Sequence, residues 1–318
     1  MQKRLSVVYA TDDNYAQHVA VSIMSLLKTS NEAIQYDLFL LGNNLSVTNR
    51  SKLTSIVKQY NASIQIIDIT NLQDKLPSDI DVAKLSISTY SRLFLADLLP
   101  VSIERILYLD CDTLITQDLF ALADYPMTDI SVYGVEDMMY PEMKVRIGLK
   151  PNDKYINAGV LLINLKRWRE ISATSRFLTF INKFDGKVPH LDQGVINGVL
   201  LDKGILPLKY NAQSPLYAIH RYNDLLRFHS LNSYYSPQEV SMARRKPVII
   251  HYTSFFVERP WFKFCLHPQK GLYRSLLKKT PYANHSLQNN KYGWNRKLKM
   301  ILFRYVQPLF LIVKYKFT

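Results

Sequence analysis

The chain has 318 residues, enough to bury one large hydrophobic core or two moderate ones, and its 47% hydrophobic and 21% charged content is that of a folded soluble protein. Two cysteines far apart in sequence exclude a disulfide-rich secreted scaffold and a zinc site built on paired cysteines, and they favour a reducing compartment. The net charge of +14 lies mostly at one end, because residues 263–318 hold twelve Lys or Arg and no Asp or Glu. The first 262 residues therefore hold 28 of the 40 basic residues against all 26 acidic ones and are close to neutral.

The sequence predicts neither a secretory signal nor a membrane-spanning helix. After Lys3 and Arg4, the apolar run over residues 5–10 is too short for the hydrophobic region of a signal peptide. No segment reaches the roughly 20 apolar residues that a spanning helix needs. We therefore expect a cytoplasmic protein.

In the first half of the chain, predicted strands alternate with predicted helices. Short apolar runs predict strands over residues 5–10, 36–41, 64–68 and 105–109. Apolar residues at helical spacing predict helices over residues 15–28, after a capping Ser46, and over 89–99, before Pro100. This alternation predicts an α/β fold in which helices cover both faces of the sheet.

The second half of the chain mixes the two kinds of element less regularly. Strands are expected over residues 131–135, 158–164 and 247–252, and helices over 174–184 and 192–201. The sequence shows no internal repeat and no obvious linker. We therefore expect one catalytic domain, residues 1–262, followed by a basic helical extension, residues 263–318.

Two carboxylates close the predicted strand 105–109. Side chains alternate along a strand, so Asp110 and Asp112 are expected on one side and Cys111 on the other, pointing into the core. Two converging negative charges at the end of an apolar strand call for a cation, and carboxylate oxygens suit Mg²⁺ or Mn²⁺. An Asp-x-Asp sequence is common, however, and by itself indicates a metal site only weakly.

Other polar side chains follow predicted strands. Asp12, Asn14 and Tyr15 lie between the first strand and the first helix, where they could bind a base or ribose or simply cap the helix. His251 ends the strand 247–252 and would favour Mn²⁺ over Mg²⁺ if it joined the two aspartates. The loop after the first strand contains no glycine-rich phosphate-binding pattern, which counts against a dinucleotide fold and a P-loop.

A further cluster surrounds the strand 158–164. Asn157 precedes a small Ala-Gly pair, at which a ligand can approach the backbone closely. Asp192 and Gln193 open a predicted helix, where free backbone N–H groups and the positive end of the helix dipole are available.

The order and setting of these segments resemble family 8 of the glycosyltransferases, which includes bacterial lipopolysaccharide galactosyl- and glucosyltransferases and, more distantly, glycogenin. Six segments between about residues 5 and 262 carry the resemblance, and their common order makes it a strong signal. They are YATDDNY (9–15), STYSRL (88–93), YLDCDTLI (108–115), NAGVLLINLKRW (157–168), LDQGVING (191–198) and HY with RPW (251–261). The resemblance implies a GT-A type fold and metal-dependent, retaining transfer of a hexose, galactose or glucose, from a UDP-sugar.

The resemblance also assigns residues to roles. For the nucleotide it implies Asp12, Asn14 and Tyr15, with the backbone of Ala10 and Thr11. For the cation, Mn²⁺ or alternatively Mg²⁺, it implies Asp110, Asp112 and His251. For the donor sugar it implies Arg92, Asp137, Asn157, Ala158, Asp192 and Gln193, with Gln193 near the anomeric carbon.

The last of the six segments departs from the family pattern. The family usually has a glycine soon after the His-Tyr pair and a lysine before Pro-Trp. Here the glycine is missing, the loop is longer, and Arg259 stands in place of the lysine. Because a guanidinium group can clamp a diphosphate, Arg259 is expected to contact the donor.

The C-terminal extension interleaves basic with aromatic and apolar residues over residues 294–318, and Pro308 is expected to kink or end a helix there. Such a segment favours the surface of an anionic membrane over a nucleic-acid partner or a solvated tail. We therefore expect peripheral attachment to the inner face of the plasma membrane and no nucleic-acid partner.

The expected function is hexose transfer from a UDP-sugar to a saccharide acceptor of a cell-surface glycan or glycoconjugate, which is lipid-linked or a glycoprotein. Two alternatives remain. A nucleotidyltransferase that makes a UDP-sugar also uses a strand-end aspartate and a metal, but it would carry a glycine-rich N-terminal loop. A catalytically inactive glycan- or membrane-binding protein would not need Asp110, Asp112, His251, Asn157 and Gln193 together.

Overall fold

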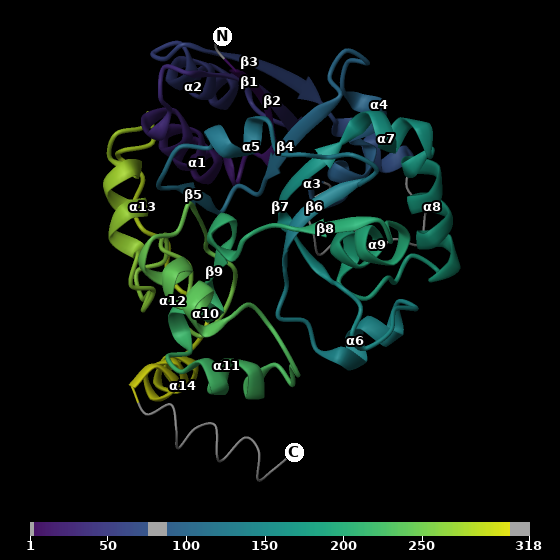
Figure 1. Cartoon of the computed structure of the whole chain (residues 1–318). Helices are drawn as coiled ribbons and strands as arrows, with labels where there is room; N and C mark the ends of the chain where they lie inside the picture. The colour runs from purple at the N-terminus through teal and green to yellow at the C-terminus, as the bar shows by residue number, and fades with distance from the viewer. Residues whose placement is uncertain (1–2, 76–87, 306–318) are drawn as a thin grey trace.

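A seven-stranded mixed sheet forms the centre of the molecule in the computed structural model, which describes residues 3–75 and 88–305 (Figure 1). The strands run in the order β3-β2-β1-β4-β7-β6-β8. β1 pairs in parallel with β2 and β4, β7 is antiparallel to β4 and β6, and β8 is parallel to β6. Their bounds are β1 Lys3–Asp12, β2 Ile34–Asn43, β3 Ala62–Asp68, β4 Arg105–Leu109, β6 Val132–Glu136, β7 Ile156–Asn164 and β8 Lys203–Ile205.

A second, three-stranded sheet was not predicted from the sequence patterns, and its strands β5 and β9 are labelled to the left of β7 in Figure 1. Its order is β5-β10-β9, with β10 antiparallel to β5 and parallel to β9. Two of its strands have three residues and one has two, so they offer too little pattern to be read from the sequence. The bounds are β5 Thr113–Ile115, β9 Ala212–Gln213 and β10 Ile249–His251, the last shorter than the predicted strand 247–252.

Helices cover both faces of the large sheet, as predicted, and period-two alternation in β1 shows why. Val7 and Tyr9 pack into the core beneath α1 and α2, whereas Val8 and Ala10 pack into the core on the opposite face with α7–α9. The longer helices are α1 Ala16–Thr29, α2 Val47–Val57, α8 Ala173–Lys183, α9 Leu191–Val199, α12 Pro237–Arg245, α13 Lys270–Leu277 and α14 Trp294–Tyr305. The shorter ones are α3 Ser88–Ser91, α4 Leu95–Leu98, α5 Phe120–Ala123, α6 Pro141–Arg146, α7 Leu165–Glu170, α10 Ser214–Ala218 and α11 Tyr222–Phe228, with 3₁₀ turns η1 Thr70–Lys75, η3 Arg92–Phe94 and η4 Leu208–Tyr210.

The helix predicted over residues 89–99 is present as a helical segment over residues 88–98, but it is not one regular α-helix. The segment consists of α3, the 3₁₀ turn η3 and α4. Side chains from Tyr90 to Ala96 are all buried, so the segment is surrounded by packing and does not present one apolar face to the core. The tight turn sits at Arg92, whose guanidinium group is directed at two carboxylates described below.

The basic C-terminal extension packs against the rest of the protein as far as it is described. α13 contacts α1, where the Tyr273 hydroxyl lies 2.6 Å from Nδ1 of His18. Tyr273, Tyr282 and Phe303 are buried in the same core cluster as β1 and α1. In the described residues no helix is both long and apolar enough to cross a bilayer. Pro308 and the apolar residues after it lie outside the described residues.

His267 in this extension is fully buried between the rings of Tyr217 and Tyr252. Burial lowers its pKa to about 3. The backbone N–H of Gln269 donates to Nδ1, so the ring proton resides on Nε2. The imidazole is therefore neutral in the folded protein, whereas in the unfolded chain it takes up a proton below about pH 6.5.

We predict that His267→Asn, which keeps an acceptor for Gln269, reduces the acid sensitivity of the fold. The variant loses ring packing, about 1–3 kcal/mol at pH 8. In the wild type, His267 takes up a proton in the unfolded chain but not in the folded protein, which favours unfolding as the pH falls from 6.5 to 4. The variant lacks this proton uptake, so over the same pH range its unfolding free energy should decrease by up to about 3 kcal/mol less than that of the wild type. Urea titrations at pH 8, 6, 5 and 4 measure this, and parallel pH curves for the two proteins would contradict it.

Candidate active site

A pocket of about 1030 Å³ opens at the edge of the large sheet where β1 and β4 end. β7 runs antiparallel to β4, so its first residues reach the same edge, and the backbone N–H of Asp110 donates to Gly159 at 2.8 Å. The pocket lining includes all the predicted site residues except Asp137 and His251. Both of these lie directly behind the lining, as described below.

The nucleotide end of the predicted site forms around the end of β1. Ala10, Thr11, Asp12, Asn14 and Tyr15 all line the pocket. The Asp12 carboxylate accepts the backbone N–H of Tyr15 at 3.0 Å, which shapes the turn into α1. The ligand and helix-start interpretations of this loop are therefore compatible.

An aromatic group adjoins this end of the pocket, and sequence reasoning missed one member of it. His18 is stacked on Trp261, with ring centroids 3.9 Å apart, and Tyr15 meets both rings edge-on. His18 lies three residues after Tyr15 on α1, a spacing that places the two side chains on one helix face. This spacing could have identified His18.

Three predicted metal ligands come together. Asp110, Asp112 and His251 offer ligand atoms that all lie within 4.8 Å of one another. Nε2 of His251 is 3.1 Å from Asp112 Oδ1 and 3.7 Å from Asp110 Oδ2. Two carboxylates and an imidazole suit a first-row divalent cation.

The reason for this convergence differs from the predicted one. The strand β4 ends at Leu109, and residues 110–112 form a turn in which the Thr113 N–H donates to the Asp110 carbonyl at 3.1 Å. The turn, rather than strand alternation, brings the two carboxylates together. Cys111 belongs to the buried core, as predicted, although it also contributes to the pocket lining, and its thiol donates to the Ala10 carbonyl.

Gly159 in β7 allows the three ligands to approach. A Cβ atom at this position would collide with the His251 ring and would lie 2.7 Å from Asp110 Oδ2. Any side chain here would therefore displace the imidazole or the carboxylate. The glycine therefore makes room for the side chains of His251 and Asp110. The sequence had predicted only that a substrate could approach the backbone here.

A chain of amide hydrogen bonds extends from His251 into the pocket. Nδ1 of His251 lies 3.0 Å from Asn211 Oδ1, and Asn211 Nδ2 donates to Asn157 Oδ1 at 2.8 Å. Because the Asn211 amide must donate to Asn157, its oxygen faces the imidazole and accepts the Nδ1–H. A neutral imidazole with its proton on Nδ1 turns the lone pair of Nε2 toward a bound cation, and in the structure Nε2 lies 3.1 Å from Asp112 Oδ1. Asn211 was not predicted, because nothing in a single sequence distinguishes it from other asparagines.

The same chain continues to Gln193. Asn157 Nδ2 donates to Gln193 Oε1 at 3.1 Å and to Asp137 Oδ2 at 3.2 Å, and Gln193 Nε2 donates to Asp137 Oδ2 at 2.8 Å. The Ala158 N–H also donates to Gln193 Oε1, at 3.0 Å. Asp137 thus lies behind the pocket wall and orients Gln193, and both polar atoms of the Gln193 amide are occupied.

Arg92 joins the metal ligands to the sugar end of the site. Its guanidinium group forms ion pairs with Asp110 at 2.8 Å and Asp192 at 2.9 Å, and it donates to the Ala158 carbonyl at 2.5 Å. Arg92 and Asp192 are both buried. Burial raises the pKa of Asp192 to about 6, against the opposing effect of Arg92. The Arg92 guanidinium group is therefore the shared ion-pair partner of Asp110 and Asp192.

Arg259 completes the site from the loop that departs from the family pattern. Its Nη2 is 3.3 Å from Asp112 Oδ2, and its guanidinium group lies 5.5 Å from the Trp261 ring centroid. Burial works to raise the pKa of Asp112, but the ion pairs with His251 and Arg259 lower that pKa below its usual range. The missing glycine has not prevented this loop from reaching the metal ligands.

Further lining residues come from elements that were not predicted to contribute. His190 precedes α9 in a left-handed conformation (φ 59°), and Gln288 and Lys291 belong to the C-terminal extension. The backbone of residues 262–263 pairs with Gln288, which brings the extension to the pocket. A long-range contact of this kind leaves no local sequence signal.

Comparison with known proteins identifies relatives of this architecture. The general stress protein A of Bacillus subtilis is 26% identical over 275 residues, 85% of this chain and 91% of the relative. A lipopolysaccharide 1,2-glucosyltransferase of Escherichia coli is 26% identical over 293 residues, 90% and 81% of the two chains. A lipopolysaccharide 1,3-galactosyltransferase of Salmonella typhimurium is 23% identical over 297 residues, again 90% and 81%.

A solved structure of the galactosyltransferase LgtC, in complex with donor and acceptor sugar analogues, superposes with a TM-score of 0.71. It is 23% identical and covers 87% of this chain and 96% of its own. This likeness confirms the expected GT-A type fold. The sequence model of the family described as glycosyl transferase family 8 matches residues 6–265. The chain therefore belongs to glycosyl transferase family 8 and is a sugar-transferring enzyme.

Proposed function

We propose that the protein catalyses metal-dependent, retaining transfer of a hexose, glucose or galactose, from a UDP-sugar to a saccharide acceptor of a cell-surface glycan or glycoconjugate. The observation that carries the proposal is the cluster of Asp110, Asp112 and His251 between the two ends of one pocket. Family membership and relatives named as glucosyl- and galactosyltransferases support the same reaction class.

In this proposal the cation is Mn²⁺, with Mg²⁺ as the alternative, held by Asp110, Asp112 and His251. When bound, such a cation supplies Lewis-acid stabilisation of the diphosphate leaving group. Arg259 lies beside Asp112 and adds a fixed positive charge for the same group. Asp12, Asn14 and Tyr15 bind the nucleoside at the end of β1.

The sugar end of the site is arranged for charge stabilisation. Asp192 is held by Arg92 at the start of α9, where its carboxylate can stabilise an oxocarbenium-like sugar. Gln193 is a poor nucleophile, since its amide oxygen already accepts hydrogen bonds from Asn157 and Ala158. This arrangement favours attack of the acceptor on the face that the leaving group vacates, which retains the anomeric configuration.

The alternative functions have less support. A nucleotidyltransferase would carry a glycine-rich loop after the first strand, and residues 10–15 contain no glycine. An inactive binding protein would have no need for the ligand cluster, the Arg92 ion pairs and the amide chain at one pocket.

We also propose peripheral attachment to the cytoplasmic face of an anionic membrane through the basic extension. On α14, Leu298 and Leu302 lie one turn apart and are 42% and 40% exposed, and Trp294 continues the stripe at 67%. Lys and Arg side chains flank this stripe along the same helix. An exposed apolar stripe with basic flanks suits an anionic lipid surface.

For the metal, we predict that UDP-hexose hydrolysis requires Mn²⁺ and ceases in EDTA. Asp110→Asn is expected to lower the rate at least about 100-fold, because it removes one ligand charge and one partner of Arg92. Hydrolysis of UDP-glucose and UDP-galactose, measured by UDP release, checks this and screens the donor sugar. Full activity in EDTA or in Asp110→Asn would refute the role of the metal.

For the amide chain, we predict that Asn211→Ala weakens Mn²⁺ binding about 10- to 100-fold, because the His251 Nδ1–H loses its acceptor. Asn211→Asp retains an acceptor oxygen and should bind Mn²⁺ nearly as well as the wild type, while losing the hydrogen bond to Asn157. Electron paramagnetic resonance titration of Mn²⁺ without donor separates binding from turnover. Equal affinities for the alanine variant and the wild type would exclude this positioning role.

For the membrane, we predict that Leu298→Gln with Leu302→Gln weakens binding to phosphatidylglycerol vesicles about tenfold, since two side chains no longer enter the lipid interface. The control is Val47→Gln with Val101→Gln, which removes two exposed apolar side chains elsewhere. Co-sedimentation with vesicles provides the measurement. If the two double variants bind equally, the attachment does not use this face of α14.

A further inference from the structure

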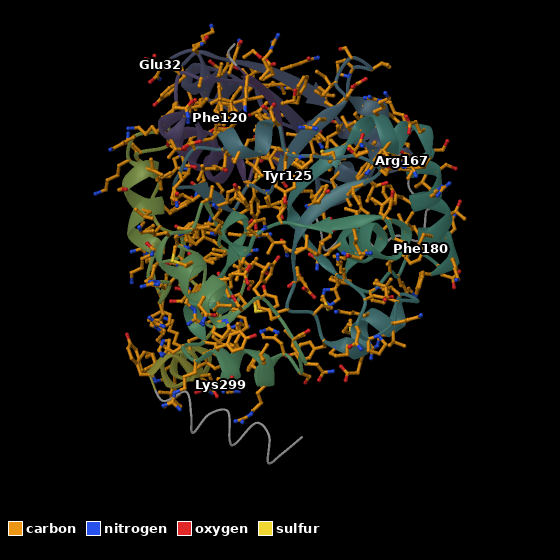
Figure 2. All side chains as sticks on the ribbon, in the orientation of Figure 1. Glu32, Phe120, Tyr125, Arg167, Phe180 and Lys299 are labelled. Atoms are coloured by element: carbon orange, nitrogen blue, oxygen red, sulfur yellow. The ribbon has the colours of Figure 1, made fainter. Side chains whose placement is uncertain are left out.

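A second hollow of about 850 Å³ lies outside the active-site pocket, between α14 and the loop that follows β10. Phe255 and Phe256 form its wall on the loop side. The α14 side contributes Trp294 and Met300 together with two cationic residues, Arg296 and Lys299. Lys299 is labelled in Figure 2, on α14 at the lower margin of the molecule. We call this hollow the α14 groove.

A packed aromatic cluster supports the walls of the α14 groove. Phe256 is stacked on Phe303, with centroids 4.3 Å apart and an interplanar angle of 12°. Phe255 and Phe228 each meet Phe303 edge-on at 5.7 Å. Because Phe303 is fully buried, this cluster fixes α14 against the loop. The groove is therefore a feature of the packed fold.

The charged residues that line the α14 groove, Arg296 and Lys299, are both basic. None of its lining residues is acidic. In the described part of the chain, no ion pair involves Arg296 or Lys299, and the sequence from residue 263 onward contains no Asp or Glu. The Arg296 guanidinium group lies 5.0 Å from the centroid of the Tyr292 ring, so the partner that the structure shows for it is an aromatic ring and not a carboxylate. Aromatic and thioether side chains next to cations without an ion-pair partner match a ligand that joins an apolar chain to a phosphate group.

The α14 groove adjoins the active-site pocket through two short stretches of chain. Phe256 of the groove and Arg259 of the pocket are three residues apart, and Lys291 of the pocket and Gly293 of the groove are two residues apart. Fully extended, these stretches span at most about 11 Å and about 7 Å. At these two places the linings therefore lie within reach of one extended acceptor molecule.

We propose that the α14 groove binds the phosphate-bearing apolar end of the acceptor, so that the acceptor class is a saccharide carried on a phosphorylated lipid. The inference builds on the proposed sugar transfer, in which the saccharide end of the same molecule enters the pocket beside Gln193. Arg296 and Lys299 contact the phosphate, and Phe255, Phe256 and Trp294 contact the first part of the lipid chain. The groove thereby selects the acceptor by its carrier as well as by its sugar.

Isothermal titration calorimetry with farnesyl phosphate, below its micelle concentration, tests the proposal on the full-length protein. Farnesyl phosphate is expected to bind at least about tenfold more tightly than farnesol or inorganic phosphate, because it satisfies both halves of the groove. Arg296→Gln with Lys299→Gln should weaken its binding about tenfold. The control, Lys278→Gln with Lys279→Gln, removes the same charge at the end of α13 and should bind as the wild type does.

A second pair of variants tests the shape of the groove. Gly293 lines the groove, and a Cβ atom placed on it meets nothing within 4 Å. Gly293→Leu is therefore tolerated by the fold and is expected to weaken farnesyl phosphate binding several-fold by filling part of the groove. Gly271 on α13 also has open space at its Cβ position, and Gly271→Leu is the matched control.

Several results would overturn the proposal. If the Lys278/Lys279 double variant loses as much affinity as the Arg296/Lys299 variant, the basic extension attracts phosphate only through its general charge. Equal binding of farnesol and farnesyl phosphate would show a merely apolar pocket. The double variant Leu298→Gln with Leu302→Gln is expected to bind farnesyl phosphate as tightly as the wild type does. A tenfold loss of affinity in this variant would assign the phosphate lipid to the membrane-facing stripe of α14.

The groove and the reaction can fail separately. UDP-hexose hydrolysis needs no acceptor, so it tests the proposed function alone. Absence of Mn²⁺-dependent hydrolysis in the wild type, with intact farnesyl phosphate binding, would reject the reaction and retain the groove as a lipid-phosphate site. Normal hydrolysis without farnesyl phosphate binding would reject the groove and retain the reaction.

Discussion

The site depends on Arg92, whose guanidinium group forms ion pairs with two different carboxylates. Asp110 and Asp192 approach the same pocket from β4 and α9, and without a cation between them the buried carboxylate of Asp192 would face a second negative charge. The guanidinium group pairs with both and is itself fixed on the Ala158 carbonyl. Arg92 begins the 3₁₀ turn in the helical segment over residues 88–98.

Around this ion pair, the candidate metal ligands and the residues of the proposed sugar pocket form one connected polar unit. The amide chain from His251 through Asn211 and Asn157 to Gln193 is buried or partly buried along its length. Each amide donates on one side and accepts on the other, so the orientation of one constrains the next. The site can therefore hold a cation and a sugar in a fixed relation, and Gly159 provides the space that such a compact arrangement requires.

The C-terminal extension contributes most of the net positive charge of the enzyme, because residues 263–318 contain twelve Lys or Arg and no Asp or Glu. As far as residue 305, it is packed into the core through Tyr273, Tyr282 and Phe303. Two surfaces result on α14, one apolar and exposed, the other grooved and facing residues 254–256. In our proposals, the first surface approaches a membrane and the second holds a lipid-carried acceptor.

The sequence by itself determined the α/β class, the strand 105–109, the Ser46 helix cap and the identity of the pocket residues, because these depend on local apolar periodicity and on motifs in a fixed order. It did not determine the small sheet β5-β10-β9, the turn that joins Asp110 to Asp112, or the place of Asp137 behind Gln193. Asn211, His18 and Lys291 reach the site from distant parts of the chain, and single residues of common types carry no signal of their partners. Only tertiary packing decided these, because contacts across long sequence separations are set by how the two sheets and the extension close on one another.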